Sequence, residues 1–369
     1  MAECLSKTAQ FINKKSGVVQ RYSRFFYPIV NSLYINPDEL EKIILERYER
    51  YAEIEAKEVL YDTYMATGNI KLLEDCQKGL ELLLNRFDTY IGESGLIETP
   101  PDYMFVDWIF IDEISMHHPP KALGQTCLNM FYFGALGFAE KIFDILNQKE
   151  AASDCSLKQK AVQEAINSLL FDKEKGVYFM GLNTPEEASP DWSWMPANTD
   201  KRYYMKHANV LAAYFGVCDD KTAKVLIRKI MNDEIAGDCQ PYFLHYLLEA
   251  ISRLGLCDEY TLSVISRWIE PVKECSKGLV EGFLKPEPTY SFDHSHAWGG
   301  TPLYSLPKAL LGFEITKPGM KEIRFNPSLL GLDHARVELP TPYGKVICEL
   351  QKGEKPKIQH PEDVDICFE

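Results

Sequence analysis

The sequence predicts a mainly α-helical protein with a small antiparallel β domain at its C-terminal end. Two observations lead to this fold class. Apolar residues recur at helical spacing from about residue 39 to residue 312, and strand-like alternation begins only near residue 321. Of the 369 residues, 46% are hydrophobic and 25% are charged, which is typical of a globular protein with a substantial core. A chain of this length favours one large and one small domain.

Residues 70–87 illustrate the helical pattern, because Leu73, Leu80, Leu84 and Phe87 fall on one face of a helix. The other stretches with such a stripe are 39–66, 122–147, 158–170, 205–215, 221–232, 241–254 and 260–270. Short breaks separate most of them, so consecutive helices are expected to be antiparallel neighbours. About ten helices approach the twelve that close a ring of six hairpins, an (α/α)6 barrel. The alternative is an unclosed array or an irregular helical bundle.

The pattern changes beyond residue 320. Residues 321–327 ("KEIRFNP") alternate Ile323 and Phe325 with charged neighbours, as in a half-buried strand. The same alternation returns in 335–340, 344–350 and 363–369. Turns at "PYG" and "KGEK" separate these stretches, so the strands are expected to pair antiparallel.

Charge and composition exclude several classes of partner. The formal net charge of −14 argues against nucleic acid, whose binding needs basic patches. No stretch approaches the roughly 18 apolar residues of a membrane-spanning helix, so no membrane partner is expected. The start of the chain lacks the apolar run of a signal peptide, which predicts a cytoplasmic protein, or a periplasmic one if an N-terminal part is missing. The ten cysteines include no CxxC pair and are expected to be reduced.

Motifs for cofactors and metals are absent from the sequence. It contains no GxSxG elbow, no P-loop and no dinucleotide fingerprint. The paired histidines of "SMHHPP" (115–120) have no third ligand at metal spacing nearby. We therefore expect neither a cofactor nor a metal. The sequence does not indicate the oligomeric state.

The stretch "SFDHSHAWGG" (291–300) combines Asp293, His294, His296 and Trp298 ahead of paired glycines. A histidine can donate to a sugar hydroxyl or to a catalytic base, and an indole offers a flat apolar face. We expect these four residues to form one wall of a sugar pocket. Neighbours two apart diverge in an extended segment, so only one of the two histidines is expected to face the sugar, and His296 is favoured because it adjoins Trp298.

A helix is predicted directly after this stretch. Thr301 suits the N-cap, Pro302 the first helical position and Gly312 the C-terminal end. Gly299 and Gly300 are expected to let the backbone turn into the helix without crowding a ligand. In a barrel of helical hairpins, loops at one rim surround a central cavity, so this loop is expected to face it. The alternative is a loop that histidine hydrogen bonds merely hold in place.

Two further segments carry residue types that suit a sugar site. Asp107 and Trp108 are adjacent in "VDW", where the carboxylate can bind hydroxyls and the indole can cover the apolar face of a sugar. Trp192 and Trp194 lie in the Pro-flanked segment "PDWSWMPAN" (190–198). We expect all four at the site, with Asp107 as a catalytic carboxylate. The alternatives are an aspartate that caps a turn and tryptophans that fill a gap.

Several segments follow one another in a recognisable order: "GLVEGF" (278–283), "SFDHSHAWGG", "LLGFEITKPG" (310–319) and "LPTPYGKV" (339–346). In this order they resemble the end of bacterial α-L-rhamnosidases of glycoside hydrolase family 78. Three upstream segments are similar to the same family: "GLIETPPDYMFVDW" (95–108), "LNMFYFGAL" (128–136) and "FDKEKGVYF" (171–179). The resemblance covers roughly residues 60–369 and is most specific in its C-terminal third.

The resemblance implies a catalytic (α/α)6 barrel over residues 1–318, either complete or short of helices at its N-terminus, and a β-sandwich over residues 319–369. It implies inverting hydrolysis of a terminal L-rhamnose or a related deoxyhexose from a glycan or glycoside. Such hydrolysis needs an acid and a base set about 6.5–9.5 Å apart. Glu281 falls where the family has its general base; the alternative is a surface glutamate before a Pro-rich loop.

One departure from the family leaves other functions open. The family's general-acid motif is not recognisable before "ATGN" (66–69), where the sequence is that of an ordinary amphipathic helix. One alternative is therefore a catalytically silent sugar-binding relative that kept the barrel and lost the acid. Another is a sugar epimerase or lyase on the same barrel, which would need several histidines to converge at the cavity. The candidates for this convergence are His207, His245, His294 and His296.

Overall fold

The computed structural model describes residues 50–98, 106–111, 114–116, 125–182, 202–274, 279–283 and 296–368. The described residues fall into two compact units, each assembled from separate segments of the chain. The bounds of the first unit are Met1–Phe105, Lys121–Leu169 and Gly181–Thr199, and those of the second are Val106–Pro120, Leu170–Met180 and Asp200–Glu369.

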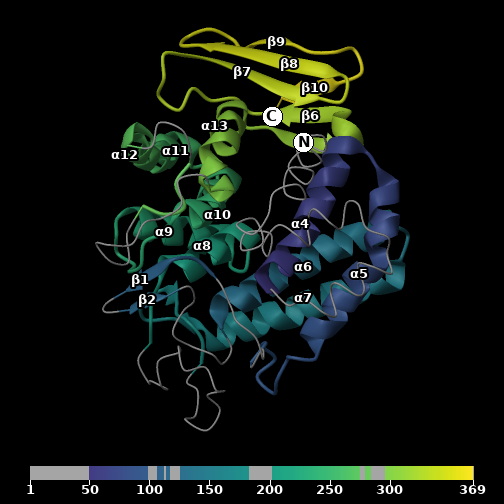
Figure 1. The fold of residues 1–369 in the computed structure, drawn as a ribbon, viewed down its shortest axis with the longest axis vertical. Helices are drawn as coiled ribbons and strands as arrows, with labels where there is room; N and C mark the ends of the chain where they lie inside the picture. Colours follow the sequence, from purple (N-terminus) through teal and green to yellow (C-terminus); the bar gives the residue numbers. More distant parts are fainter. Residues whose placement is uncertain are drawn as a thin grey trace, which may run out of the picture. The chain divides into compact units, whose positions relative to one another are not determined.

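Four helices make up the described part of the first unit: α4 (Arg50–Thr67), α5 (Ile70–Asp88), α6 (Thr126–Ile145) and α7 (Lys149–Leu169). Helix α6 packs against α7 and also contacts α4 and α5 (Figure 1). Buried side chains surround α6 from Cys127 to Phe143, so this helix lies in the core of the unit. None of the described helices is long and apolar enough to cross a membrane.

Helix α7 begins earlier than the sequence predicted. Helical spacing indicated residues 158–170, whereas the helix starts at Lys149. Its first half buries only Ala152 and Cys155, and larger apolar side chains such as Val162 follow later. Small buried residues give a weak periodic signal, which explains why the first turns were missed.

The helices of the second unit are α8 (Lys206–Phe215), α9 (Asp220–Met231), α10 (Pro241–Arg253), α11 (Cys257–Ile265), α12 (Ile269–Glu274) and α13 (Thr301–Leu311). Helix α8 packs against α9, and α10 packs against α8, α11 and α13. The consecutive pairs α8–α9 and α10–α11 are therefore neighbours, as predicted for hairpins. The predicted stretches 205–215, 221–232 and 241–254 agree with α8, α9 and α10 to within one residue at each end.

Residues 260–270, predicted as one helix, are divided among α11, a 3₁₀ turn (Ser266–Trp268) and α12. Pro271 gives the physical reason for the division. Proline lacks the N–H that a continuing helix would use and clashes with the preceding turn, but it is tolerated in the first turn of a new helix. Helix α12 accordingly starts two residues before Pro271.

Helix α13 starts differently from the prediction. Gly300 occupies the N-cap position, and Thr301 is the first helical residue. The Thr301 hydroxyl donates to the carbonyl of Trp298 at 3.1 Å, so it does not cap the helix N–H groups, and the prediction of Thr301 as N-cap was wrong. The predicted end is confirmed, because Gly312 adopts a left-handed conformation with φ of 54°.

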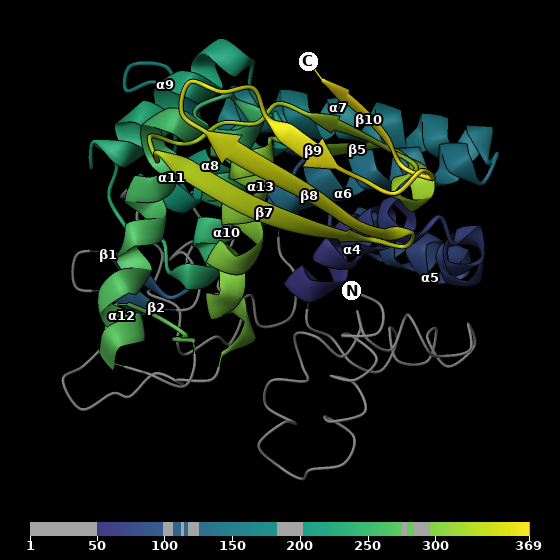
Figure 2. The same cartoon turned by 90° about the horizontal axis from the view of Figure 1, so that it is seen from above.

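Two three-stranded sheets form the C-terminal part of the second unit. Their strands are β5 (Glu314–Lys317), β6 (Glu322–Phe325), β7 (His334–Thr341), β8 (Gly344–Gln351), β9 (Lys357–Gln359) and β10 (Asp365–Phe368). The order is β10-β6-β5 in one sheet and β7-β8-β9 in the other, whose strands run side by side in Figure 2. All the pairs are antiparallel except β10 with β6, which is parallel because the chain crosses from β9 back to the first sheet. This pair departs from the antiparallel expectation.

The two sheets share one core with α13. Leu310 and Leu311 of α13 are buried in the same cluster as Phe325, Val337 and Val346 of the strands. The core therefore extends across residue 318, where the sequence placed the start of the β domain. That boundary stays a prediction, and β5, which the sequence did not predict, already begins at Glu314.

Short strand pairs precede two of the helices. Strand β1 (Ile109–Ile111) pairs with β2 (Ile114–Met116), and β3 (Phe171–Asp172) pairs with β4 (Val177–Tyr178). Strand β1 follows Trp108 directly, so the "VDW" segment enters the second unit at the edge of this small hairpin.

Candidate active site

Trp108 and Glu281 meet in the second unit although 173 positions separate them in the chain. The indole Nε1 of Trp108 donates to Oε1 of Glu281 at 3.1 Å. The side chain of Glu281 is 12% exposed, so it is largely enclosed without being closed to solvent. A carboxylate with this exposure and a neutral donor on one oxygen can accept a proton on the other.

His296 and Trp298 lie against the same glutamate. The indole Nε1 of Trp298 donates to the backbone carbonyl of Glu281 at 2.9 Å, and Nδ1 of His296 lies 3.9 Å from Oε2. The rings of His296 and Trp298 are stacked, with centroids 4.0 Å apart and planes 35° apart. Tyr242 of α10 lies on Trp298 with a centroid distance of 5.1 Å. We call Trp108, Tyr242, His296 and Trp298 the aromatic cluster.

His296 is a neutral ring at physiological pH. Burial lowers its pKa from the ordinary value of 6.5 to about 4, because desolvation disfavours the charged imidazolium. A neutral imidazole can donate through one nitrogen and accept through the other. His296 can therefore contribute a hydrogen bond next to Glu281, but not a positive charge.

Asp107 is fully buried and directed away from solvent. Its Oδ2 accepts from the backbone N–H of Gln240 at 2.9 Å and lies 3.0 Å from Nε2 of His207, and its Oδ1 accepts from the backbone N–H of Trp108 at 2.9 Å. Burial raises the pKa of Asp107, and the hydrogen bonds act in the opposite direction. Asp107 is thus adjacent in the chain to Trp108, whose indole binds Glu281. The carboxylate oxygens of Asp107 accept hydrogen bonds from other protein groups.

Gln240 was missed by the sequence reasoning. Its side-chain Oε1 accepts from the backbone N–H of Phe283 at 2.8 Å, and its Nε2 donates to the carbonyl of Asp238 at 3.2 Å. Gln240 precedes Pro241 and occupies the N-cap position of α10. This place in the sequence gives no indication of a distant partner. Tyr242 was missed as well, because an aromatic residue in the apolar stripe of a helix is expected to belong to the hydrophobic core.

A close backbone approach fixes the loop beside Glu281. The backbone N–H of His296 donates to the carbonyl of Leu279 at 2.9 Å. A Cβ at Gly299 would lie 2.5 Å from the carbonyl oxygen of Val280, which no real side chain tolerates. Glycine is therefore needed at 299 for this approach, and the contact is with the chain that leads into Glu281.

The remaining predicted site residues are placed as follows. Trp192, Trp194, Asp293 and His294 lie outside the described residues. The described residues that the structure brings together are Asp107, Trp108, Glu281, His296 and Trp298. Of these five residues, Asp107 is the one that is fully buried and contacts only protein groups.

The described histidines do not converge on one cavity. His207 contacts Asp107 and packs on Phe243, whereas His245 packs on Tyr246 and Tyr304. His296 is the histidine next to Glu281. These contacts give no support to an epimerase or lyase that needs several histidines at one point.

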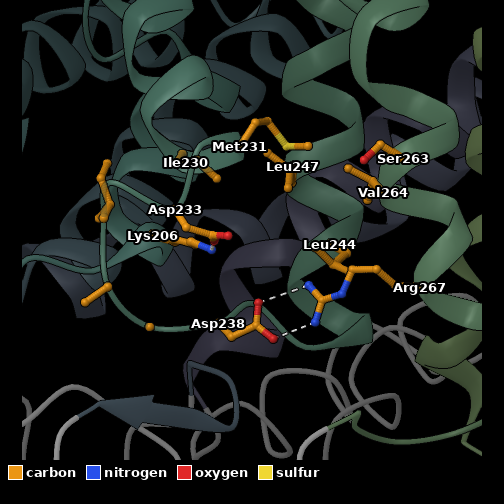
Figure 3. A pocket seen from close by; sticks show the side chains of 13 residues that line it. Lys206, Ile230, Met231, Asp233, Asp238, Leu244, Leu247, Ser263, Val264 and Arg267 are labelled. Atoms are coloured by element: carbon orange, nitrogen blue, oxygen red, sulfur yellow. Dashed lines mark hydrogen bonds and ion pairs between the residues drawn. The ribbon is translucent and has the colours of Figure 1, made fainter.

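A cavity of about 670 Å³ lies elsewhere in the second unit, among α9, α10, α11 and the segment 233–238 (Figure 3). Two ion pairs line it: Lys206 with Asp233, and Arg267 with Asp238. Its other walls are mainly apolar side chains of the three helices. Neither Glu281 nor the aromatic cluster contributes to its lining, so it is not part of the candidate site.

Comparison with known proteins identifies the fold. No protein-family model and no curated protein matches the sequence. Among solved structures, the family GH78 rhamnosidase of Bacillus sp. GL1 matches with a TM-score of 0.76 and 18% identity over 94% of this chain and 38% of that one. The α-L-rhamnosidase of Aspergillus terreus matches with a TM-score of 0.66 and 14% identity over 94% and 42%. The α-L-rhamnosidase of Streptomyces avermitilis, complexed with L-rhamnose, matches with a TM-score of 0.60 and 13% identity over 93% and 34%.

The chain therefore has the fold of the family GH78 α-L-rhamnosidases. This result confirms the predicted fold class, a helical-hairpin barrel of the (α/α)6 type followed by a small β domain, and the predicted resemblance to that family. The chain spans about two fifths of the length of the solved rhamnosidases that it matches.

Proposed function

We propose that the chain is a rhamnosidase-like glycoside hydrolase that releases a terminal L-rhamnose or related deoxyhexose with inversion, with Glu281 as the general base. The observation that carries the proposal is the carboxylate of Glu281, which accepts a hydrogen bond from Trp108 beside the aromatic cluster and belongs to a side chain that is not fully buried. Aromatic rings next to a carboxylate suit a sugar, because rings cover its apolar face while oxygens bind its hydroxyls. The shared fold with rhamnosidases supports the substrate class.

The proposed reaction uses Glu281 to activate water. The carboxylate takes a proton from the water as its oxygen bonds to the anomeric carbon, and the bond between that carbon and the leaving oxygen breaks. The leaving oxygen must receive a proton from an acid. Neutral His296 supplies a hydrogen bond to a sugar hydroxyl near the base.

One observation favours a second candidate, a catalytically silent sugar-binding protein. Inverting hydrolysis needs two carboxyl groups that both reach the substrate. Of the two carboxylates expected at the site, Asp107 is fully buried and binds protein donors through both oxygens. Within the described residues of this cluster, Glu281 is then the carboxylate left to meet a sugar.

The test compares hydrolysis and binding in the same preparations. We expect turnover of an aryl α-L-rhamnoside by the wild type and its loss in Glu281→Gln, which keeps the shape and removes the base. Glu338→Gln on β7 is the matched control and should retain full turnover. Wild-type turnover no higher than that of Glu281→Gln would sink the hydrolase proposal. In that event, binding of L-rhamnose measured by calorimetry would support the silent sugar-binding protein. If L-rhamnose does not bind either, neither the hydrolase nor the sugar-binding candidate is supported.

A further inference from the structure

We infer that Asp107 and Gln240 act together as positioning residues that set the geometry of Glu281. The two residues are joined by a hydrogen bond, and each is connected to the glutamate by a separate route. The inference rests on the proposed role of Glu281, and it assigns Asp107 a role other than proton transfer to the substrate.

The first route runs through Trp108. Oδ1 of Asp107 accepts from the backbone N–H of Trp108 at 2.9 Å, which fixes the main chain of the residue. The indole of the same Trp108 donates to the carboxylate of Glu281 at 3.1 Å. A shift of the Trp108 backbone would carry the indole with it, so the carboxylate of Asp107 controls where this donor points.

The second route runs through Gln240. The backbone N–H of Gln240 donates to Oδ2 of Asp107 at 2.9 Å, and its side-chain Oε1 accepts from the backbone N–H of Phe283 at 2.8 Å. Phe283 lies two residues after Glu281, so this bond holds the main chain on the C-terminal side of the glutamate. Trp268 and Arg267 enclose the Phe283 ring at 5.0 and 4.7 Å from its centroid, which limits its movement.

His207 completes the environment of Asp107. Its ring is fully buried, Nε2 lies 3.0 Å from Oδ2 of Asp107, and Nδ1 has no hydrogen-bond partner among the described residues. A buried nitrogen that lacks a partner is tolerated better as a bare acceptor than as an orphan donor, since it then buries no polar N–H. A ring proton therefore belongs at Nε2, which donates to Asp107.

With this tautomer Asp107 accepts three hydrogen bonds and is closed to solvent. A fully buried carboxyl group whose hydrogen-bond donors are all supplied by protein is a rigid anchor, and it has no contact with solvent through which a sugar oxygen could reach it. Both routes from this anchor end within two residues of the Glu281 carboxylate.

The test reads the geometry of Glu281 with and without sugar. The indole N–H of Trp108 and that of Trp298 both donate to Glu281, so their NMR resonances in tryptophan-¹⁵N-labelled protein report its position without any ligand. Single Trp→Phe substitutions assign them among the five tryptophans of the chain. The variants are Asp107→Asn, Gln240→Met and the double substitution, and L-rhamnose binding and aryl α-L-rhamnoside turnover are measured on each.

Asn129→Leu is the matched control. Asn129 is also fully buried, and its side chain accepts from the backbone N–H of Ile97 at 2.8 Å and donates to the Ile97 carbonyl at 3.2 Å. It belongs to the first unit, so its loss removes a similar buried bond without touching the routes to Glu281. A general loss of stability should affect both kinds of variant alike.

We expect Asp107→Asn and Gln240→Met to shift both indole resonances and to weaken sugar binding or kcat/KM at least about tenfold, with the double variant no worse than the more severe single one. Asn129→Leu should leave the two resonances in place.

Unchanged indole resonances in Gln240→Met, equal shifts in Asn129→Leu, or additive losses in the double variant would each overturn the inference. If the resonances shift as expected but the wild type neither binds nor hydrolyses rhamnosides, the positioning network stands and the proposed function fails. Should Asp107→Asn not fold, Gln240→Met carries the test alone.

Discussion

The indole of Trp298 donates to the backbone of Glu281, whereas the indole of Trp108 donates to the carboxylate of the same glutamate. The first indole donates to the Glu281 carbonyl at 2.9 Å and the second to Oε1 at 3.1 Å. Glu281 thus has one indole donor on its main chain and one on its carboxylate. Two rigid donors at different points of a residue restrict both its position and its rotamer, which is the kind of support a catalytic carboxylate needs.

Trp108→Phe tests the hydrogen bond that the Trp108 indole donates to the Glu281 carboxylate. The substitution keeps an aromatic side chain beside Glu281 and removes the N–H donor to the carboxylate together with part of the ring volume. A hydrogen bond to a charged group contributes about 1.5–3 kcal/mol, so we expect kcat/KM or sugar affinity to fall roughly 10- to 100-fold. Steady-state kinetics or calorimetry measures the change. Asn129→Leu, which removes a buried side-chain hydrogen bond in the first unit, is the comparison, and an equal loss there would show that the carboxylate bond has no special importance.

The paired glycines offer a matched test of the backbone approach. A Cβ at Gly299 would meet the Val280 carbonyl oxygen at 2.5 Å, whereas at Gly300 the closest atom would be Cδ1 of Leu279 at 3.3 Å, the end of a flexible side chain. We expect Gly299→Ala to lower the free energy of unfolding by about 1–3 kcal/mol and to weaken sugar binding. Gly300→Ala should change both much less. Chemical denaturation and calorimetry on the two variants decide the matter, and equal effects would contradict it.

Helix periodicity predicted most of the described helices because their buried faces carry large apolar side chains. It failed where another kind of residue decides the structure. Small buried residues hid the start of α7, and Pro271 divided the last predicted stretch before the loop into two helices. Strand β5 was missed because "EITK" offers too few alternating positions to distinguish it from a turn.

The candidate site shows a similar limit. Residue type and the resemblance to rhamnosidases were enough to select Trp108, Glu281 and Trp298, which the structure brings into contact. The sequence could not show that the adjacent side chains of "VDW" have different partners, with Asp107 buried and Trp108 on Glu281. It gave no sign of Gln240, because a buried glutamine that binds main-chain groups 43 positions away leaves no local pattern.

The two histidines of the loop should contribute unequally to sugar binding. His296 is stacked on Trp298 and lies 3.9 Å from the Glu281 carboxylate, whereas His294 lies outside the described residues. We expect His296→Ala to weaken L-rhamnose binding roughly fivefold or more, which corresponds to a neutral hydrogen bond of about 1 kcal/mol. His294→Ala should have the smaller effect. Calorimetry with both variants tests this order, and melting temperatures show whether either has lost its fold. Equal, negligible losses at unchanged melting temperature would place the pocket elsewhere.

The buried ring of His296 also predicts a pH dependence of stability. Its pKa is lowered from 6.5 to about 4 in the folded protein, so between these values the unfolded chain binds a proton that the folded protein does not. Stability must therefore fall as the pH drops through this window, by about 1.4 kcal/mol per pH unit and up to roughly 3 kcal/mol in all for this one group. At pH 6.5 half of the unfolded chains still carry this proton, so the contribution to the slope vanishes only about one pH unit higher.

His296→Gln removes this titration and isolates it from the carboxylates that titrate in the same range. Denaturation curves at pH 7.5, 6.5, 5.5 and 4.5 give the free energy of unfolding of the wild type and the variant. We expect the wild type to lose stability relative to His296→Gln most steeply below pH 6.5, and the difference to level off toward pH 7.5. The same substitution at His334, which is exposed on β7, controls for the loss of an imidazole as such. A difference between wild type and His296→Gln that stays flat from pH 7.5 to 4.5 would mean that His296 is solvated in the folded protein and is not held neutral beside Glu281.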